Sequence, residues 1–330
     1  MRTTLIVILG LAIVLGVVVA VGPATPVPTL RAVMPHMPDD LGDLQQRIDA
    51  AERQYPVRPG LQAQILWADS VPSVTDVAIV YLHGFSGTWR DGSPAIERVA
   101  AELRANVFLA RLPGHGLRTA EPLVDFHPDS VYAGAVRALA IGKRLGRRVV
   151  VVGTSTGATL GMMLAAAYPR DIAAIVNWSP NVRLAHPLSF LSNGPWGLAL
   201  TKVILGGPYR EVRTDDSARN AYWYMKYRAE AIPQLQALLE AGMTDETFAA
   251  IRQPTLTMCW YASDAAQDSL VSVPAMRTMH EQLAATSKAF VELDARNHEI
   301  GYAPESRAVD DVVRRTVEWS NLARTYNSLP

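Results

Sequence analysis

Short apolar runs alternate along most of the chain with longer segments whose apolar residues recur at helical spacing. The short runs carry Val, Ile and Leu on consecutive positions, a pattern typical of strands buried on both faces. We predict such strands at Leu61–Trp67, Val77–Leu82, Val107–Ala110, Val149–Val152, Ala173–Trp178, Thr255–Trp260 and Ala289–Leu293. The alternation with helices indicates an α/β fold, with a mostly parallel sheet covered by helices on both faces.

The predicted helices lie between these strands and at both ends of the folded body. An amphipathic helix is expected after Asp39, and the last helix is expected from Pro304 to about Asn321. The others are predicted from Ser93 to Ala105, over Asp129–Leu145, after Gly157 and from Pro274.

The alternation is interrupted between about Asn181 and Ala250. This stretch is rich in aromatic residues, and most of these side chains are expected to pack a small core of their own. An insertion after the strand Ala173–Trp178 would lie over the carboxyl ends of the strands, where ligands bind in such sheets. We therefore predict a helical lid insertion at residues 181–250, between two parts of the core at residues 39–180 and 251–330.

The amino-terminal residues have a different composition. Leu5–Val21 is a run of 17 uncharged apolar residues, at the lower limit of length for a membrane span. Residues 1–21 are therefore expected to be a transmembrane anchor, with a cleaved signal peptide as the alternative. Because Arg2 precedes the run, the folded body should lie outside the cytoplasm, anchored to the membrane or, after cleavage, secreted or periplasmic. Residues 22–38 are rich in proline and predict an extended linker with few contacts.

Composition and charge exclude some classes of function. The 330 residues hold 31 Lys and Arg against 31 Asp and Glu, so the net charge is zero and no nucleic-acid surface is expected. With 49% hydrophobic residues, the chain is long enough for one large α/β domain. The single cysteine, Cys259, has no companion for a disulfide or a metal site and is expected to be a buried thiol.

The segment "VVVVGTSTGATLG", from Val149 to Gly161, places a serine between two glycines where a predicted strand meets a predicted helix. A turn this tight imposes strained dihedral angles on Ser155 and brings backbone atoms close together, so Gly153 and Gly157 stand where a Cβ would clash. The G-x-S-x-G pattern in this context is that of a nucleophile elbow. Ser155 is therefore the predicted nucleophile.

A serine hydroxyl needs a base that takes its proton and an acid that orients that base. In the elbow architecture the acid and then the histidine follow the serine along the chain, on loops after later strands. His298, which follows the strand Ala289–Leu293, is the predicted base. Three carboxylates are candidates for the acid, and we favour Asp268 over its loop neighbour Asp264 and over Asp294.

Two backbone N–H groups are candidates for stabilising an oxyanion. Thr156 stands at the start of the helix after the serine, where N–H groups have no partner within the helix. Phe85 follows His83 and Gly84, and the glycine allows the loop to turn so that the N–H of Phe85 faces the site. His83 is expected to stabilise its loop rather than to act as a base, and His115 lies in another loop that could also reach the site.

The motifs "LHGFSGTW", "RLPGHG", "GTSTGATLG", "DSLV" and "NHEIG" occur in this order along the chain. They resemble the successive motifs of the α/β-hydrolase superfamily, in particular of its serine esterase and monoacylglycerol-lipase-like branch, and the resemblance covers about Leu61 to Asn321. It implies the α/β-hydrolase fold, with the following site residues: Ser155 as nucleophile, Asp268 as acid, His298 as base, and Phe85 and Thr156 as oxyanion donors. The sequence departs from the family pattern in its longer acid loop, "SDAAQD", and in the threonines on either side of Ser155.

These residues predict a serine hydrolase that cleaves small, moderately apolar carboxylic esters through an acyl-enzyme intermediate. Such a mechanism requires neither a metal nor an organic cofactor. The same triad can cleave amides, so a peptidase of the proline-iminopeptidase type is an alternative. A non-catalytic binding protein with this fold is a further alternative, although the serine, acid and histidine are all present.

Overall fold

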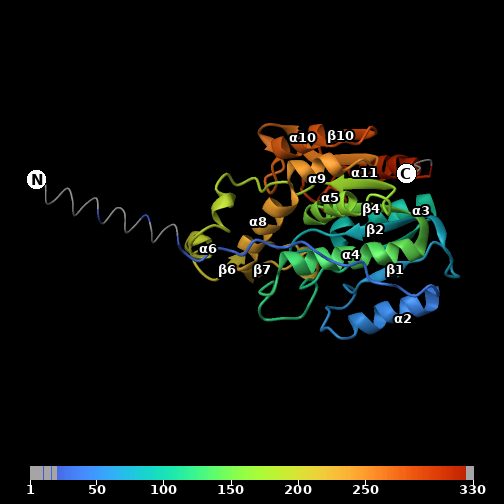
Figure 1. The fold of residues 1–330 in the computed structure, drawn as a ribbon, viewed down its shortest axis with the longest axis horizontal. Coiled ribbons are helices and arrows are strands. Elements are labelled where there is room, and N and C mark those ends of the chain that lie inside the picture. Colours follow the sequence, from blue (N-terminus) through green and yellow to red (C-terminus); the bar gives the residue numbers. More distant parts are fainter. Residues whose placement is uncertain (1–9, 11–15, 17–20, 325–330) are drawn as a thin grey trace, which may run out of the picture.

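An eight-stranded sheet forms the centre of the protein (Figure 1). The computed structural model describes residues 10, 16 and 21–324. The strands of this sheet are β1 (Gln64–Leu66), β2 (Thr75–Leu82), β3 (Asn106–Leu109), β4 (Gly146–Thr154), β5 (Ala174–Trp178), β8 (Thr255–Ser263), β9 (Ala266–Gln267) and β10 (Lys288–Leu293). Their order is β1-β3-β2-β4-β5-β8-β10, with β9 paired to β8. Only the pairs β1–β3 and β8–β9 are antiparallel, which confirms the predicted mostly parallel sheet.

Helices cover both faces of this sheet, and the buried side chains divide into two main cores accordingly. The helices of the body are α2 (Leu41–Glu52), α3 (Ala95–Leu103), α4 (Pro128–Leu145), α5 (Thr156–Ala167), α10 (Val273–Gln282) and α11 (Val309–Leu322). In β4, Val149 and Val151 belong to the core under α4 and α5, whereas Val150 and Val152 belong to the core under α3 and α11. Successive strand side chains point to opposite faces, so a doubly covered strand needs an uninterrupted apolar run.

The last helix begins later than its sequence predicts. We expected it from Pro304, but α11 begins at Val309. The carbonyl oxygen of Tyr302 accepts hydrogen bonds from the N–H groups of Glu305 (3.2 Å) and Ser306 (2.9 Å), so the intervening residues form turns. A proline alone does not specify whether the next residues continue a turn or start a helix.

Part of the insertion between β5 and β8, comprising α6, β6 and β7, lies at one end of the body (Figure 1). The elements of the insertion are η2 (Ser189–Leu191), α6 (Gly197–Leu205), β6 (Tyr209–Glu211), α7 (Ser217–Tyr222), β7 (Lys226–Arg228), α8 (Ala231–Gly242) and α9 (Asp245–Ala250). The helices α8 and α9 pack on α5, so this part of the insertion is joined to the body.

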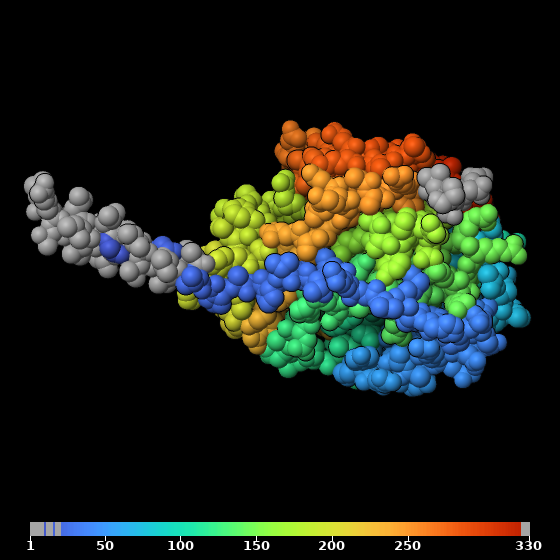
Figure 2. Space-filling view, viewed as in Figure 1, coloured from blue at the N-terminus to red at the C-terminus, as the bar shows by residue number. Residues whose placement is uncertain are grey.

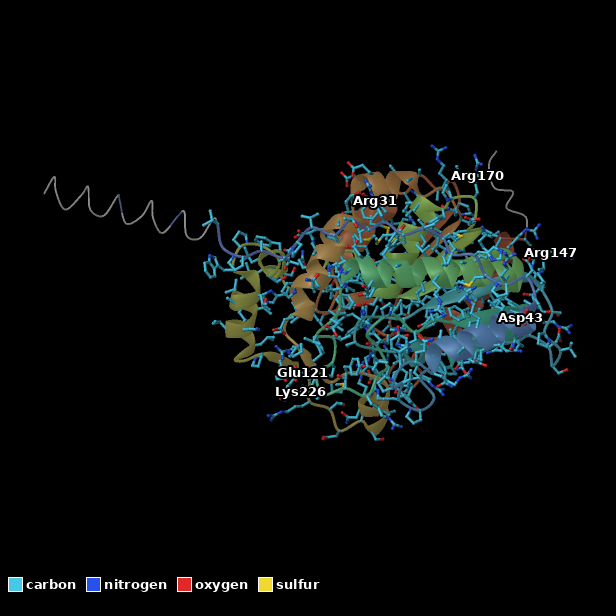
Figure 3. All side chains as sticks on the ribbon, turned by 60° about the horizontal axis from the view of Figure 1, so that its bottom comes forward. Arg31, Asp43, Glu121, Arg147, Arg170 and Lys226 are labelled. Carbon is cyan, nitrogen blue, oxygen red and sulfur yellow. The ribbon has the colours of Figure 1, made fainter. Side chains whose placement is uncertain are left out.

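An ionic contact fastens the insertion to the loop that precedes α4. Glu121, in that loop, forms an ion pair with Arg228 and accepts a hydrogen bond from the Tyr209 hydroxyl at 2.5 Å. Figure 3 shows Glu121 beside Lys226, the first residue of β7. The short sheet formed by β6 and β7 is therefore attached to the body through charged side chains and through Tyr227, which packs against a main core beside Phe85.

Residues 22–38, which we call the strap, lie along the surface of the body from the α6 end towards α2 (Figures 1 and 2). The backbone N–H of Leu30 donates to Asp129 Oδ1 at 2.6 Å, and the Tyr168 hydroxyl donates to the carbonyl oxygen of Ala32 at 2.8 Å. Met37 is buried in the core under α4. The expectation of few contacts is therefore wrong, because single apolar residues of an extended segment can anchor it without any periodic pattern.

The predicted membrane segment falls mostly outside the described residues. Of Leu5–Val21, the structure describes only residues 10, 16 and 21. Within the described part of the chain, no helix combines the length and the apolar character needed to cross a membrane.

Candidate active site

Ser155 occupies the turn between β4 and α5, with φ 53° and ψ −118°. Its N–H donates to the carbonyl oxygen of Trp178 in β5 at 2.9 Å, which fixes this strained residue to the neighbouring strand. A Cβ on Gly157 would lie 1.9 Å from the carbonyl oxygen of Leu82, and one on Gly153 would lie 2.5 Å from the nearest backbone nitrogen. Both positions therefore require glycine, for the reason that the sequence suggested.

Asp268 and His298 meet in a buried pair. Asp268 follows the short strand β9, and His298 lies in the loop after β10. Asp268 Oδ2 lies 2.5 Å from His298 Nδ1, while Asp268 Oδ1 accepts the backbone N–H groups of Leu270 (2.9 Å) and Val271 (3.1 Å). In the neutral ring, these contacts place the proton on Nδ1 and leave Nε2 available as an acceptor.

The two other candidate acids lie elsewhere. Asp264 is exposed and accepts a hydrogen bond from the Tyr261 hydroxyl at 2.8 Å, in the turn between β8 and β9. Asp294 is exposed and forms an ion pair with Arg307. Of the three carboxylates, the structure brings Asp268 into contact with His298.

His83 and His115 both hold loops together. His83 Nε2 accepts the N–H of Leu112 at 3.0 Å, so its Nδ1 carries the proton and donates to the carbonyl oxygen of Gly84 at 2.8 Å. His115 Nε2 accepts the N–H of Ser86 at 3.2 Å. Burial lowers the pKa of His83 well below its usual value and that of His115 to about 4, so both rings stay neutral.

The loop that carries Phe85 is fixed by a buried carboxyl group that the sequence analysis did not single out. Asp91 Oδ2 accepts the N–H of Gly84 at 2.6 Å, and its Oδ1 accepts the Tyr81 hydroxyl at 2.5 Å. Tyr81 also contacts Thr154 Oγ1 at 2.7 Å, one residue before Ser155. This chain of hydrogen bonds joins the Gly84–Phe85 loop to the serine turn. An acid in the stretch "TWRDG" carries no periodic signal that would have indicated it.

Arg219, from α7 of the insertion, reaches the loop of His298. Its guanidinium donates to Glu299 at 2.7 Å and to Glu305 at 2.9 Å, and it stacks over the Trp223 ring at 4.9 Å. Glu299 is the residue after His298 and is itself buried. The position of the histidine loop is therefore tied to the insertion through a charged contact that sequence periodicity could not reveal.

The titration of His298 reflects two opposing effects. Burial alone lowers the pKa of an imidazole, but the carboxylate of Asp268 opposes this and, together with Glu299 and Asp91, raises the pKa of His298 to about 9. Burial raises the pKa of the Asp91 carboxyl to about 8, despite the hydrogen bonds from Tyr81 and Gly84 that favour its ionised form. The groups around this site thus titrate well away from their ordinary values, as is typical of functional sites.

A cavity of about 590 Å³ opens above Ser155 and His298. Gly84 and Phe85 border it on the side of β2, and Thr154 and Asp91 also reach it. The remaining wall comes largely from apolar side chains of the insertion and of the loop after Asp268, among them Leu184, Leu188, Leu205, Ile232, Leu235 and Val271. A predominantly apolar cavity with a few convergent polar groups is the usual form of a small-molecule site.

A doubly covered, mostly parallel sheet with a strained serine turn after a central strand defines the class of α/β-hydrolase folds. The sequence matches the model of the alpha/beta hydrolase family over residues 79–315. The chain belongs to the alpha/beta hydrolase family, as its motifs predicted. None of the curated proteins compared with it matched.

Several solved structures share this fold. One belongs to the study of LipS and LipT, two metagenome-derived lipolytic enzymes, with a TM-score of 0.62, 17% identity, and coverage of 80% of this chain and 99% of that chain. Another is the monoacylglycerol lipase of Paleococcus ferrophilus, with a TM-score of 0.56, 16% identity, and coverage of 80% and 99%. A soluble variant of monoglyceride lipase from Saccharomyces cerevisiae gives a TM-score of 0.52, 13% identity, and coverage of 82% and 98%. At these identities the likeness concerns the fold.

Proposed function

We propose that the protein is a serine ester hydrolase in which Ser155, His298 and Asp268 act as a catalytic triad. The observation that carries the proposal is the buried Asp268–His298 pair, which borders the same cavity as the strained serine. Family membership supports hydrolysis, and the similar structures of lipolytic enzymes and monoacylglycerol lipases support an ester as the substrate.

In this mechanism the Ser155 hydroxyl attacks the ester carbonyl carbon while His298 Nε2 takes its proton. The imidazolium is stabilised by Asp268 and passes the proton to the leaving alcohol. Water, activated by the same histidine, then attacks the acyl-enzyme and releases the acid. The backbone N–H groups of Phe85 and Thr156 would donate to the oxyanion of both tetrahedral intermediates.

The reaction calls for alkaline conditions. His298 acts as a base only when it is neutral, and its pKa is raised to about 9 by the neighbouring carboxylates. The value of kcat/KM should therefore rise with pH through the neutral range. A water-excluding site is consistent with the burial of both His298 and Asp268.

We further propose that residues 181–250 form the lid of this site. Their apolar side chains supply much of the cavity wall, which supports a moderately apolar acyl group as the part of the substrate bound there. On the sequence of Leu5–Val21, we propose that the chain is anchored to a membrane with its folded body outside the cytoplasm.

Replacement of Ser155 by alanine tests the proposed function. The Ser155→Ala variant should lose hydrolysis of nitrophenyl esters and labelling by a fluorophosphonate probe, while its thermal unfolding stays close to that of the parent protein. A panel of acyl chain lengths, with aminoacyl amides alongside, identifies the preferred bond. Retained turnover in a folded Ser155→Ala protein would exclude this serine as the nucleophile, and faster amide than ester cleavage would replace the esterase by a peptidase.

A further inference from the structure

The insertion presents an unusual number of apolar side chains to solvent. Between Leu184 and Pro208 the only charged residue is Lys202, and its ammonium group is paired with Glu230 at 2.8 Å. We use the name collar for a set of exposed apolar residues in this segment: Leu188, Phe190, Leu191, Leu200, Val203 and Ile204. Exposed apolar side chains gathered in one segment in this way mark a site of interaction.

The helix α6 has its apolar side turned outward. Gly197 and Thr201 are its buried residues, whereas Val203 is 77% exposed and Ile204 is 64% exposed. A helix on the surface of a globular body normally buries its apolar stripe and exposes its polar one. Since small residues face the body here, the outward face of α6 is suited to an apolar environment.

The collar adjoins the entrance of the cavity. Leu188 and Ile204 are both exposed to solvent and part of the cavity lining that includes Ser155. A surface that covers the collar would therefore lie against the opening of the site. Any apolar molecule held by that surface would have a short path to the serine.

The strap leaves the body at the same place. The N–H of Trp196 donates to the carbonyl oxygen of Pro23, and the N–H of Thr25 donates to the carbonyl oxygen of Asn193, both at 2.9 Å. Figure 2 shows the beginning of the strap beside the insertion. The 17-residue apolar run Leu5–Val21 directly precedes this junction in the sequence, so a membrane that holds the run would lie next to the collar.

We propose that the collar docks on the surface of a lipid bilayer, with the cavity opening towards the lipid. Its apolar side chains would enter the boundary between headgroups and acyl chains, as the apolar faces of interfacial helices do. The paired Lys202 adds no net charge at this surface. One consequence of this docking rests on the proposed function: the ester substrate is drawn from the membrane rather than from water.

The docking itself can be tested without any measurement of activity. Cys259 is the only cysteine in the sequence and is buried, with a pKa raised by burial to about 12, so a cysteine introduced at the surface can be labelled selectively. A fluorophore would be attached to Val203→Cys in the full chain, assembled into phosphatidylcholine nanodiscs. Arg147→Cys is the matched control, because Arg147 is exposed at the opposite end of the body from α6 (Figures 1 and 3).

We expect brominated lipid to quench the fluorophore at position 203, and dissolved iodide to quench it weakly. The fluorophore at position 147 should show the reverse. Free access of iodide to position 203 would overturn the proposal. Protection from iodide without quenching by brominated lipid would also overturn it, and would indicate a second copy of the chain if the protection depends on protein concentration, or the amino-terminal segment if it does not.

The consequence for substrate uptake has its own measurement. Val203→Asp and Phe190→Asp, neither in the cavity lining, should leave hydrolysis of a water-soluble short ester unchanged and slow hydrolysis of a long-chain ester dissolved in the nanodisc. Equal rates on the lipid-dissolved ester in parent and variants would show that the collar does not deliver substrate. Absence of all ester hydrolysis in the parent protein would refute the proposed function, while the quenching result would still decide the docking.

Discussion

Replacing Asp268 by asparagine removes the charge beside His298 and keeps the size of the side chain. The N–H groups of Leu270 and Val271 donate to Asp268 Oδ1, so the carbonyl oxygen of the new amide would be held at that position. The amide N–H would then face His298 Nδ1, which would have to accept. The ring proton would move to Nε2, the atom that we propose takes the proton of the serine.

The size of the effect follows from the pKa of His298. A rise from the ordinary 6.5 to about 9 corresponds to about 3 kcal/mol in favour of the protonated ring. Without the Asp268 charge, burial lowers the pKa of His298. The acidic limb of the pH profile, where kcat/KM falls because His298 becomes protonated, should therefore move from near pH 9 to about 6.5 or below. Because the tautomer is also wrong, kcat should fall by about 10³- to 10⁴-fold.

Stability should change with pH in a matching way. A group whose pKa is raised by folding stabilises the folded state below its unfolded pKa and loses this contribution as the pH rises through its folded pKa. For His298 the loss should occur between pH 6.5 and about 9. The unfolding free energy of the parent protein should contain this decrease, and that of Asp268→Asn should lack it.

The assay is the pH profile of nitrophenyl ester hydrolysis, with Ser155→Ala as the blank for spontaneous hydrolysis at high pH. Asp264→Asn is the matched control, since Asp264 lies in the turn just before β9 and is exposed. It should retain activity close to that of the parent protein. A greater loss in Asp264→Asn than in Asp268→Asn, or an acidic limb that stays near pH 9 in Asp268→Asn, would refute the assigned acid.

Three further changes test the surroundings of the site and the strap. Asp91→Asn can still accept the N–H of Gly84 and should retain activity above pH 8, whereas Asp91→Ala should lower kcat; equal kcat in the two variants would show that this anchor is unimportant. Arg219→Met leaves Glu299 unpaired and should shift the acidic limb of kcat/KM to higher pH, with Arg213→Met as an exposed control that leaves it unchanged. Deleting residues 1–38 should lower the unfolding free energy by about 3 kcal/mol relative to deleting residues 1–21. The reason is that the longer deletion removes the buried Met37 and the rest of the strap. Equal denaturant midpoints for the two deletions would contradict this.

The strands and the serine turn could be predicted because their causes are local. A doubly covered strand requires an unbroken apolar run, and β4 has one at Val149–Val152, shortly before the strand ends at Thr154. The strained turn requires glycine at two positions, which the sequence shows directly. Where one residue type is the only one that fits, its presence can be interpreted without the fold.

The choice among the acids could not be made in the same way. Asp264 and Asp268 lie on either side of β9, and which of them reaches His298 depends on the pairing of β9 with β8, where the register shifts. That pairing brings Asp268 next to a histidine 30 residues further along the chain. The short strands of the insertion, the Asp91 contact and the course of the strap likewise depend on long-range packing rather than on periodicity.

The charges around His298 connect these long-range contacts to chemistry. Asp268 touches the ring, whereas Glu299 and, when it is ionised, Asp91 act on it through space, and each carboxylate favours the protonated form. Arg219, which belongs to the insertion, forms an ion pair with Glu299. The distance between the two groups therefore determines how far the guanidinium offsets the effect of the Glu299 charge on the imidazole. A displacement of α7 that breaks this ion pair would raise the pKa of His298 further and lower the fraction of neutral imidazole at a given pH. The insertion therefore acts on the basicity of the histidine as well as on the shape of the cavity.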